Sequence, residues 1–162
     1  MLTKYAWVLF LSFIPVSEIR GGMIYAFSVM EGIEQLLTAY IIAVIGNFLP
    51  VPFIMLLFRP IVKWLKKTRL FGKFAHWLEN RTSSKAQGFK KASAGALLIF
   101  VAIPFPTTGA WTGAMIASLL DIRFKYALPA ILAGIAIAGL IVALLCGGVW
   151  NLGALGEWLI TQ

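Results

Sequence analysis

Charged residues are scarce in this sequence. Asp, Glu, Lys and Arg make up 12% of the 162 residues, and apolar residues make up 60%. Soluble domains carry roughly 25% charged residues. The composition therefore excludes a soluble enzyme or a soluble binding domain. It predicts an integral membrane protein, and the length predicts a single domain, residues 1–162.

Cysteine and histidine are nearly absent. The one cysteine, Cys146, lies in an apolar run, and the one histidine, His76, lies in a basic segment. These two residues cannot build a disulfide framework or a metal site. A Ser–His arrangement at membrane depth is also excluded, because the histidine lies outside the apolar segments. We therefore expect no metal, no cofactor and no enzymatic activity.

The positive charge is concentrated in one part of the chain. The net charge is +8, and ten of the fourteen Lys and Arg residues lie between Arg59 and Lys91. Apolar residues recur at helical spacing from Ile61 to Leu78, which predicts an amphipathic helix at the cytoplasmic membrane surface. A calmodulin-like target helix is the alternative. Basic charge beside apolar segments favours membrane lipids, and not nucleic acid, as the partner.

Four apolar segments have the roughly 20 residues that a helix needs to span a bilayer. In chain order they are Tyr5–Met30, Leu36–Phe58, Ala94–Leu119 and Tyr126–Val149. The second and fourth contain no charge. In the fourth, Gly134 and Ala138 belong to a small-residue face that suits close helix packing.

The first and third segments are interrupted by proline and glycine. Adding 89 to the number of Pro15 gives Pro104, and the same offset carries the second apolar segment onto the fourth. The chain therefore repeats an architecture. Repeat 1 is residues 1–58, a basic cytoplasmic linker is residues 59–92, and repeat 2 is residues 93–162.

An interrupted segment can be one kinked span or a re-entrant hairpin of two half-helices. If the interrupted segments are hairpins, each repeat crosses the membrane once, and the two repeats have opposite orientations in the membrane. If they are full spans, each repeat crosses twice, and the two repeats have the same orientation. The stretch PFPTTG leaves backbone groups unpaired, which is tolerated at membrane depth only under cover of protein or water. This favours an all-α fold of two inverted repeats, each a re-entrant helical hairpin followed by one transmembrane helix. Both arrangements keep the basic linker in the cytoplasm.

Two stretches resemble a known family. PVSEIRGG (15–22) and PFPTTGAWTGAMIASLL (104–120) resemble the paired signatures of the small multidrug export protein family, which is similar to the DedA-type membrane proteins with re-entrant hairpins. Ile24 and Thr107 stand where that pattern usually has proline and glycine. The resemblance implies a multi-pass transporter in the cytoplasmic (inner) membrane of a prokaryote. The family name implies drug export, whereas DedA-type relatives are associated with polyprenyl-phosphate lipid carriers.

Glu18 and Arg20 place opposite charges in the first interruption. A charge at the centre of a membrane helix costs roughly 2.5 to 3.5 kcal/mol on insertion scales, so it usually marks a pathway or a buried pair. In one interpretation these residues form salt bridges that hold the hairpins together. Residues two apart do not face each other on a helix, so each would need a non-helical backbone or another partner, such as Asp121 or Arg123. In the other interpretation they line a cavity, where Glu18 exchanges protons and Arg20 contacts the substrate.

Two half-helices are expected to begin near mid-membrane, one at Gly21 and one near Ala110. Ser17 or Glu18 could cap the first, and Thr107 or Thr108 the second. Helix N-termini carry partial positive charge and free N–H groups, which together with Arg20 favour a phosphate headgroup. The alternative is an ionised Glu18 that recruits a cationic drug, with Tyr25 and Trp111 as aromatic faces.

The candidate substrate-binding or coupling residues lie in or beside the two interruptions or are polar groups elsewhere near the apolar segments. They are Ser17, Glu18, Arg20, Gly21, Asn47, Pro106, Thr107, Thr108, Gly109, Trp111, Thr112 and Arg123. Asn47 either hydrogen-bonds between helices or faces the cavity. We expect a proton-coupled transporter of an amphipathic substrate, with a polyprenyl phosphate as the best candidate. Small multidrug efflux and a non-transporting membrane scaffold are the alternatives, and a homo-oligomer is expected because two full spans enclose little space.

Overall fold

The structure is a computed structural model that describes residues 1–66, 86–104 and 109–160. All regular structure in these ranges is helical, so the predicted all-α class is confirmed for this part of the chain. The helices are α1 (Leu2–Phe13), α2 (Glu18–Val29), α3 (Ile33–Phe48), α4 (Pro50–Lys66), α6 (Ala86–Ala102), α7 (Ala110–Leu119) and α8 (Phe124–Ile160).

Within the described ranges, two helices are long and apolar enough to cross a membrane. One is Ile33–Ile61, in which α3 and α4 join through Leu49, and it has 29 residues; the other is Phe124–Gly148 of α8, with 25 residues. At a rise of 1.5 Å per residue they measure about 43 Å and 37 Å, more than the roughly 30 Å of a hydrocarbon core. They correspond to the second and fourth apolar segments of the sequence.

The first of these long helices exposes a band of large apolar side chains, four residues apart. The band consists of Ile33, Leu37, Ile41, Ile45, Leu49, Phe53 and Leu57. The side chains of Ala39, Ala43, Val51 and Met55 are fully buried on the inner side. An exposed apolar surface of this extent is typical of a membrane interface, because soluble monomers rarely present one.

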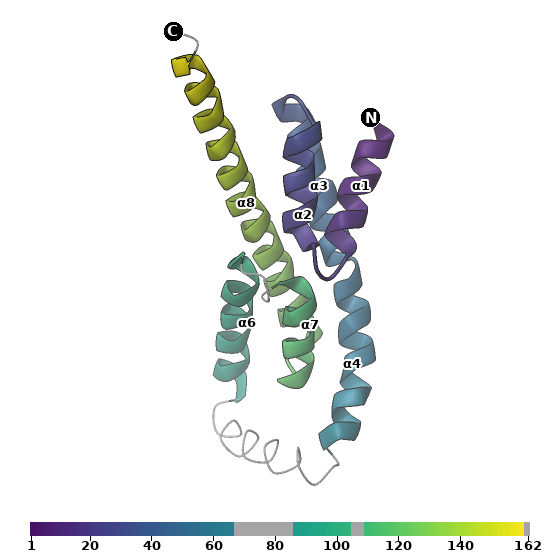
Figure 1. Cartoon of the computed structure of the whole chain (residues 1–162). Coiled ribbons are helices and arrows are strands. Elements are labelled where there is room, and N and C mark those ends of the chain that lie inside the picture. The colour runs from purple at the N-terminus through teal and green to yellow at the C-terminus, as the bar shows by residue number, and fades with distance from the viewer. Residues whose placement is uncertain (67–85, 105–108, 161–162) are drawn as a thin grey trace.

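The two interrupted segments form pairs of shorter helices. α1 and α2, the first helix pair, lie antiparallel beside the upper half of the molecule in Figure 1, and α6 and α7, the second helix pair, lie beside the lower half. α1 and α2 have 12 residues each and α7 has 10. These three helices are therefore about 15 to 18 Å long, roughly half the thickness of a hydrocarbon core.

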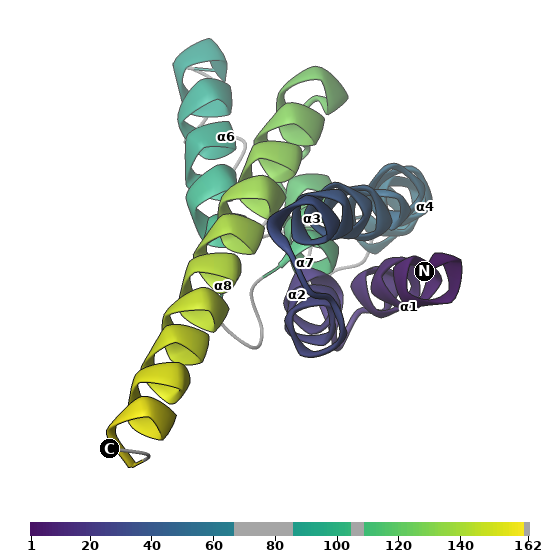
Figure 2. The same ribbon diagram turned by 90° about the horizontal axis from the view of Figure 1, so that it is seen from above.

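The two helix pairs pack on the long helices in a reciprocal way. α1 and α2 contact α3, and α6 and α7 contact α8; in addition, α2 contacts α8 and α7 contacts α4. Viewed from above, α8 crosses between α6 on one side and α2 and α3 on the other (Figure 2). The second helix of each pair thus reaches the long helix of the other half of the chain.

The turns before the two long helices also correspond. Gly32 has φ +99° and precedes α3, and Asp121 has φ +51° and precedes α8. The two positions are 89 residues apart, which is the offset that relates Pro15 to Pro104. The repeated architecture of the sequence therefore extends to the backbone conformation of these turns.

The predicted close approach at Gly134 is confirmed. A Cβ atom at Gly134 would lie 2.7 Å from Val101 Cβ and 2.9 Å from the Leu98 carbonyl oxygen of α6. On the same helix, the Ala136 carbonyl accepts a hydrogen bond of 2.7 Å from the Tyr40 hydroxyl of α3. α8 is therefore held on both sides, by α6 and by α3.

The basic linker expected at residues 59–92 overlaps two helices. α4 continues to Lys66, and α6 begins at Ala86. Arg59 donates a hydrogen bond to the Ile122 carbonyl, and its guanidinium lies 4.3 Å from the centroid of the Phe124 ring. Most of the amphipathic helix predicted from Ile61 to Leu78 lies outside the described residues.

Candidate functional site

The first helix pair turns at residues 14–17, where Pro15 ends α1. Ile14 has the extended backbone (φ −69°, ψ 135°) that a following proline favours. Glu18 then has φ +51°, in the left-handed region. For a residue other than glycine this conformation costs about 1 to 3 kcal/mol. It removes Glu18 from the regular helical path and so sets the direction of its side chain.

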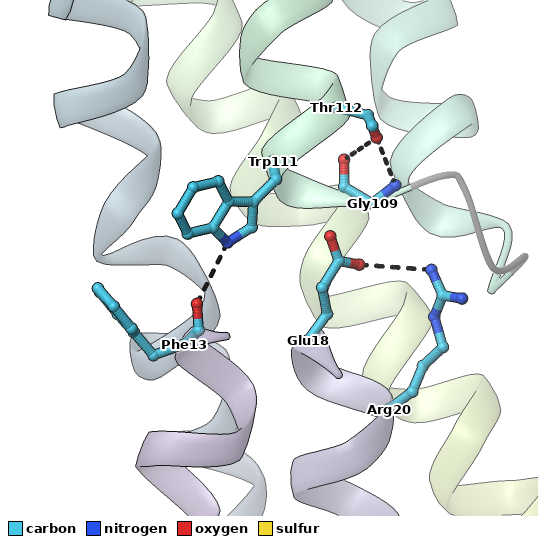
Figure 3. A network of polar contacts seen from close by, with 6 residues as sticks. All are labelled: Phe13, Glu18, Arg20, Gly109, Trp111 and Thr112. Atoms are coloured by element: carbon cyan, nitrogen blue, oxygen red, sulfur yellow. Dashed lines mark hydrogen bonds and ion pairs between the residues drawn. The ribbon is translucent and has the colours of Figure 1, made fainter. Parts of the chain in front are cut away.

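The Glu18 side chain is buried against the start of α7, with 8% of its surface exposed. A terminal guanidinium nitrogen of Arg20 lies 3.4 Å from Glu18 Oε2, and the backbone N–H of Trp111 donates a hydrogen bond to the carboxylate. Figure 3 shows the carboxylate directed away from α2 toward Gly109, with the guanidinium beside it. A cation and a helix N-terminus thus meet one carboxylate, and both favour its negative charge.

Gly109 packs directly against the Glu18 side chain of the first helix pair. A Cβ atom at this position would overlap the Glu18 carboxylate. The backbone of Gly109 is extended (φ −178°, ψ −167°), a conformation that any residue can adopt. Glycine at this position therefore makes room for the Glu18 carboxylate and is not needed for the backbone conformation.

Trp111 joins α7 to the end of α1. Its indole Nε1 donates a hydrogen bond of 3.2 Å to the Phe13 carbonyl, and the two rings meet edge to face with centroids 6.4 Å apart. Both contacts cross from one helix pair to the other, as Figure 3 shows for the hydrogen bond. In the structure, Trp111 therefore acts as a contact between helices.

The predicted cap of α7 by Thr107 or Thr108 is wrong, because the N-cap residue is Gly109. Thr112 reaches back instead: its hydroxyl accepts a hydrogen bond of 3.0 Å from the Gly109 N–H and lies 3.2 Å from the Gly109 carbonyl. Thr107, Thr108 and Pro106 lie outside the described residues.

At the start of α2 the structure differs from the predicted cap as well. Ser17 is the N-cap residue, but its side chain makes no capping hydrogen bond. Its hydroxyl lies instead against the Cα of Gly21, at the position that a Cβ atom would occupy. Ser17 and Gly21 therefore pack on each other, one turn apart, beside the Glu18–Arg20 pair.

The Glu18–Arg20 pair forms within one helix pair. Residues two positions apart can pair here because the backbone of Glu18 is left-handed and not α-helical. A non-helical backbone was one of the two ways in which the sequence allowed this pair to form. Asp121 and Arg123 lie in the turn after α7, both exposed. Since α7 has 10 residues, that turn is about 15 Å from Gly109. The structure does not bring Arg123 to the site.

Two more polar side chains are buried near the turn without a partner. Ser12 is 0% exposed and Asn47 is 1% exposed, and neither Ser12 Oγ nor Asn47 Oδ1 has a hydrogen bond. Ser12 Oγ lies against the Cα of Gly22, which is one helical turn after Glu18. Sequence reasoning missed Ser12. The available signal was a lone hydroxyl in an apolar run, three residues before Pro15.

The assembled site contains a carboxylate, a guanidinium and the N-terminus of a helix. Within the described ranges, no three His, Cys, Asp or Glu side chains come together as metal ligands. Such a site can bind and release a proton at Glu18, and it can hold a small anion through Arg20 and backbone N–H groups. It can also simply fasten the two helix pairs together.

The family model of the small multi-drug export proteins matches residues 18–141, most of the chain. The chain belongs to this family, as the resemblance implied, and it is a membrane protein. The match begins at Glu18 and includes α2, Gly109 and Trp111. Searches of curated proteins and of solved structures gave no match.

Proposed function

We propose that this member of the small multi-drug export family is a proton-coupled transporter whose substrate is an amphipathic molecule with a phosphate headgroup. A polyprenyl phosphate is the substrate that we favour, and the cytoplasmic membrane of a prokaryote is the proposed location. The observation that carries the proposal is the burial of Glu18, with the half-buried Arg20 beside it, where two short helix pairs meet. Buried charges between interrupted helices are typical of transport sites.

The proposed topology is two inverted repeats, in which each short helix pair is a re-entrant hairpin. Three features support it: the half-membrane length of α1, α2 and α7, the reciprocal contacts of α2 with α8 and α7 with α4, and the matching turns at Gly32 and Asp121. The N-terminus and the last residues of α8 lie at the upper end in Figure 1, opposite the end of α4 and the start of α6. The basic linker then lies in the cytoplasm and both termini lie outside.

Cysteine labelling in cells tests this topology. In a Cys146→Ala background, Thr3→Cys and Glu31→Cys should react with a membrane-impermeant maleimide from outside, and Arg123→Cys should react only after permeabilisation. All three side chains replaced are exposed. Glu31 is external under either topology and serves as the positive control. External labelling at Arg123 together with an internal Thr3 would establish four ordinary spans and refute the inverted repeat.

The site favours an anionic substrate over a cationic drug. Arg20 and the N-terminus of α7 are both positive, and Glu18 is the carboxylate that faces them. Trp111, which could offer a face to a cation, is used in the contact with Phe13. Protonation of Glu18 would leave the positive groups unbalanced, which strengthens the attraction for a phosphate.

Transport in proteoliposomes tests the function. We expect polyprenyl phosphate to move across the bilayer in response to a pH gradient, and we expect Arg20→Lys to reduce the rate about tenfold or more, because lysine lacks the planar fork that binds phosphate. Arg123→Lys makes the same change about 15 Å away, by the length of α7, and should have no effect. Equal rates for both variants, or movement of a quaternary ammonium drug instead, would contradict the proposal.

A further inference from the structure

Glu18 already uses the groups that a phosphate headgroup would need. Arg20, the Trp111 N–H and the open Cα face of Gly109 all contact its carboxylate. Carboxylate and phosphate oxygens accept the same charge-assisted hydrogen bonds from a guanidinium and from backbone N–H groups. Two anions cannot occupy one such position, so Glu18 and a headgroup exclude each other there.

The carboxylate reaches α7 from the other helix pair, through a backbone in the left-handed region. α7 does not depend on it for the N–H of Gly109, because the Thr112 hydroxyl caps that group. When the contact with Glu18 breaks, the Gly109 N–H therefore keeps its partner, and the Trp111 N–H is the group that a headgroup would take over.

Ser12 gives a second, independent indication. Its Oγ is fully buried, has no hydrogen-bond partner, and lies against Gly22, four residues after Glu18 on α2. An ionised carboxylate only accepts hydrogen bonds, whereas a protonated carboxyl group also donates one. The structure therefore holds a buried acceptor that remains unused while Glu18 is ionised.

We propose that Glu18 is a tethered competitor of the substrate: when ionised it occupies the anion site at Arg20 and the start of α7, and when protonated it leaves that site to a phosphate monoester headgroup and hydrogen-bonds to Ser12. This inference rests on the proposed function and adds how proton and substrate are coupled. Glu18 must be protonated before the anion binds, so the proton and the anionic substrate cross the membrane in the same direction.

Arg20 is the charged group that faces Glu18. α7 contributes no charged side chain, since its sequence AWTGAMIASL contains none. The charged residues Lys4, Glu34 and Lys125 on helices packed against α2 lie at helix ends away from the turn. Lys4, for example, bonds to the Val29 carbonyl at the other end of α2. Gly139 is the part of α8 that packs on Ile19; Lys125 is fourteen residues earlier, about 21 Å along the helix.

Binding of dodecyl phosphate to the full-length protein in a non-ionic detergent tests the competition. Wild type and Glu18→Gln are compared by calorimetry at each pH from 5 to 8.5, so that the ionisation of the ligand itself cancels. At pH 8 we expect Glu18→Gln to bind at least about tenfold more tightly than wild type, because no carboxylate competes. At pH 5 the two affinities should converge. Ser12→Ala should need a lower pH than wild type to reach the same affinity.

Equal or weaker binding by Glu18→Gln at pH 8, with Arg20→Gln abolishing binding, would overturn the competition and leave the anion site intact. No binding to any variant would instead refute the proposed function. If Glu18→Gln does not fold, Glu18→Ala replaces it in this experiment, because alanine also removes the carboxylate. Competition by inorganic phosphate distinguishes the source of the headgroup. If inorganic phosphate fails to displace dodecyl phosphate, a lipid substrate is supported. If inorganic phosphate displaces dodecyl phosphate at comparable concentration, a free phosphate substrate is supported.

Discussion

The two helix pairs share a layout but differ in chemistry. Each interrupted segment has a proline at its break and is followed by a turn with positive φ and a long helix. In the first pair, the start of α2 carries two charges, Glu18 and Arg20. α7 of the second pair carries none, and its buried residues are all small: Ala110, Gly113, Ala114, Ala117 and Ser118.

This difference means that neither pair holds a complete site. The first supplies a carboxylate and a guanidinium, and the second supplies backbone N–H groups and the space at Gly109. A symmetric pair of sites would require a charge at the start of α7, where the described residues are glycine, alanine and tryptophan. Each helix pair therefore contributes one part of the proposed site.

Gly109→Ala should have the largest effect on the contact between the two helix pairs. The added Cβ overlaps the Glu18 carboxylate, so either that side chain must leave its position or the two helix pairs must move apart. Overpacking of this kind costs about 1 to 3 kcal/mol, and we expect a lower melting temperature in detergent together with loss of transport. Gly95→Ala is the matched control: it lies in α6 with no atom within 4 Å of the added Cβ, and it should be neutral or slightly stabilising. Equal melting temperatures for the two variants would show that the contact at Gly109 is unimportant.

Trp111→Phe should have a smaller effect, because the ring remains and only the indole donor is lost. The Phe13 carbonyl loses its partner across the two pairs, and one such hydrogen bond contributes about 1 kcal/mol. We expect a modest fall in melting temperature. Trp7→Phe, at a side chain that is 49% exposed, should leave the melting temperature unchanged. A fall of the same size in both variants would argue against a specific link between the pairs.

Ser12→Ala should have the smallest effect on stability, and it should stabilise the protein where the other two variants destabilise it. The change removes a buried hydroxyl oxygen that has no partner, so the free energy of unfolding should rise by about 1 kcal/mol. The same variant should shift transport to lower pH, because protonated Glu18 loses its acceptor. The two readouts are measured on one preparation, by thermal melting and by uptake. A loss of stability would mean that the hydroxyl has a partner in the folded protein.

Sequence reasoning found the long helices, the interruptions and most of the residues at the site. Hydrophobicity over about 20 residues is a local property, so Leu36–Phe58 and Tyr126–Val149 could be identified without tertiary information. Glu18 and Arg20 could be identified in the same way, because charges inside an apolar segment are conspicuous.

The contacts themselves could not be predicted. The pairing of Glu18 with Arg20 depends on one positive φ, and Trp111 meets Phe13 across 98 residues. The cap of α7 was misplaced because threonines before a helix are good caps, whereas here Thr112 reaches back from inside it. Arg123 was included for its charge, and only the length of α7 shows that it lies away from the site.

The most direct test of the account is Glu18→Gln, measured both by thermal melting in detergent and by polyprenyl phosphate movement in proteoliposomes with and without a pH gradient. Glutamine keeps the shape of the side chain but cannot ionise. We predict a folded protein whose transport no longer responds to the gradient, while Glu34→Gln, an exposed carboxyl group on α3, behaves as wild type. If Glu18 is instead one half of a structural pair, removing its charge costs about 3 to 5 kcal/mol. Unchanged, gradient-dependent transport with a sharply lower melting temperature would contradict the account.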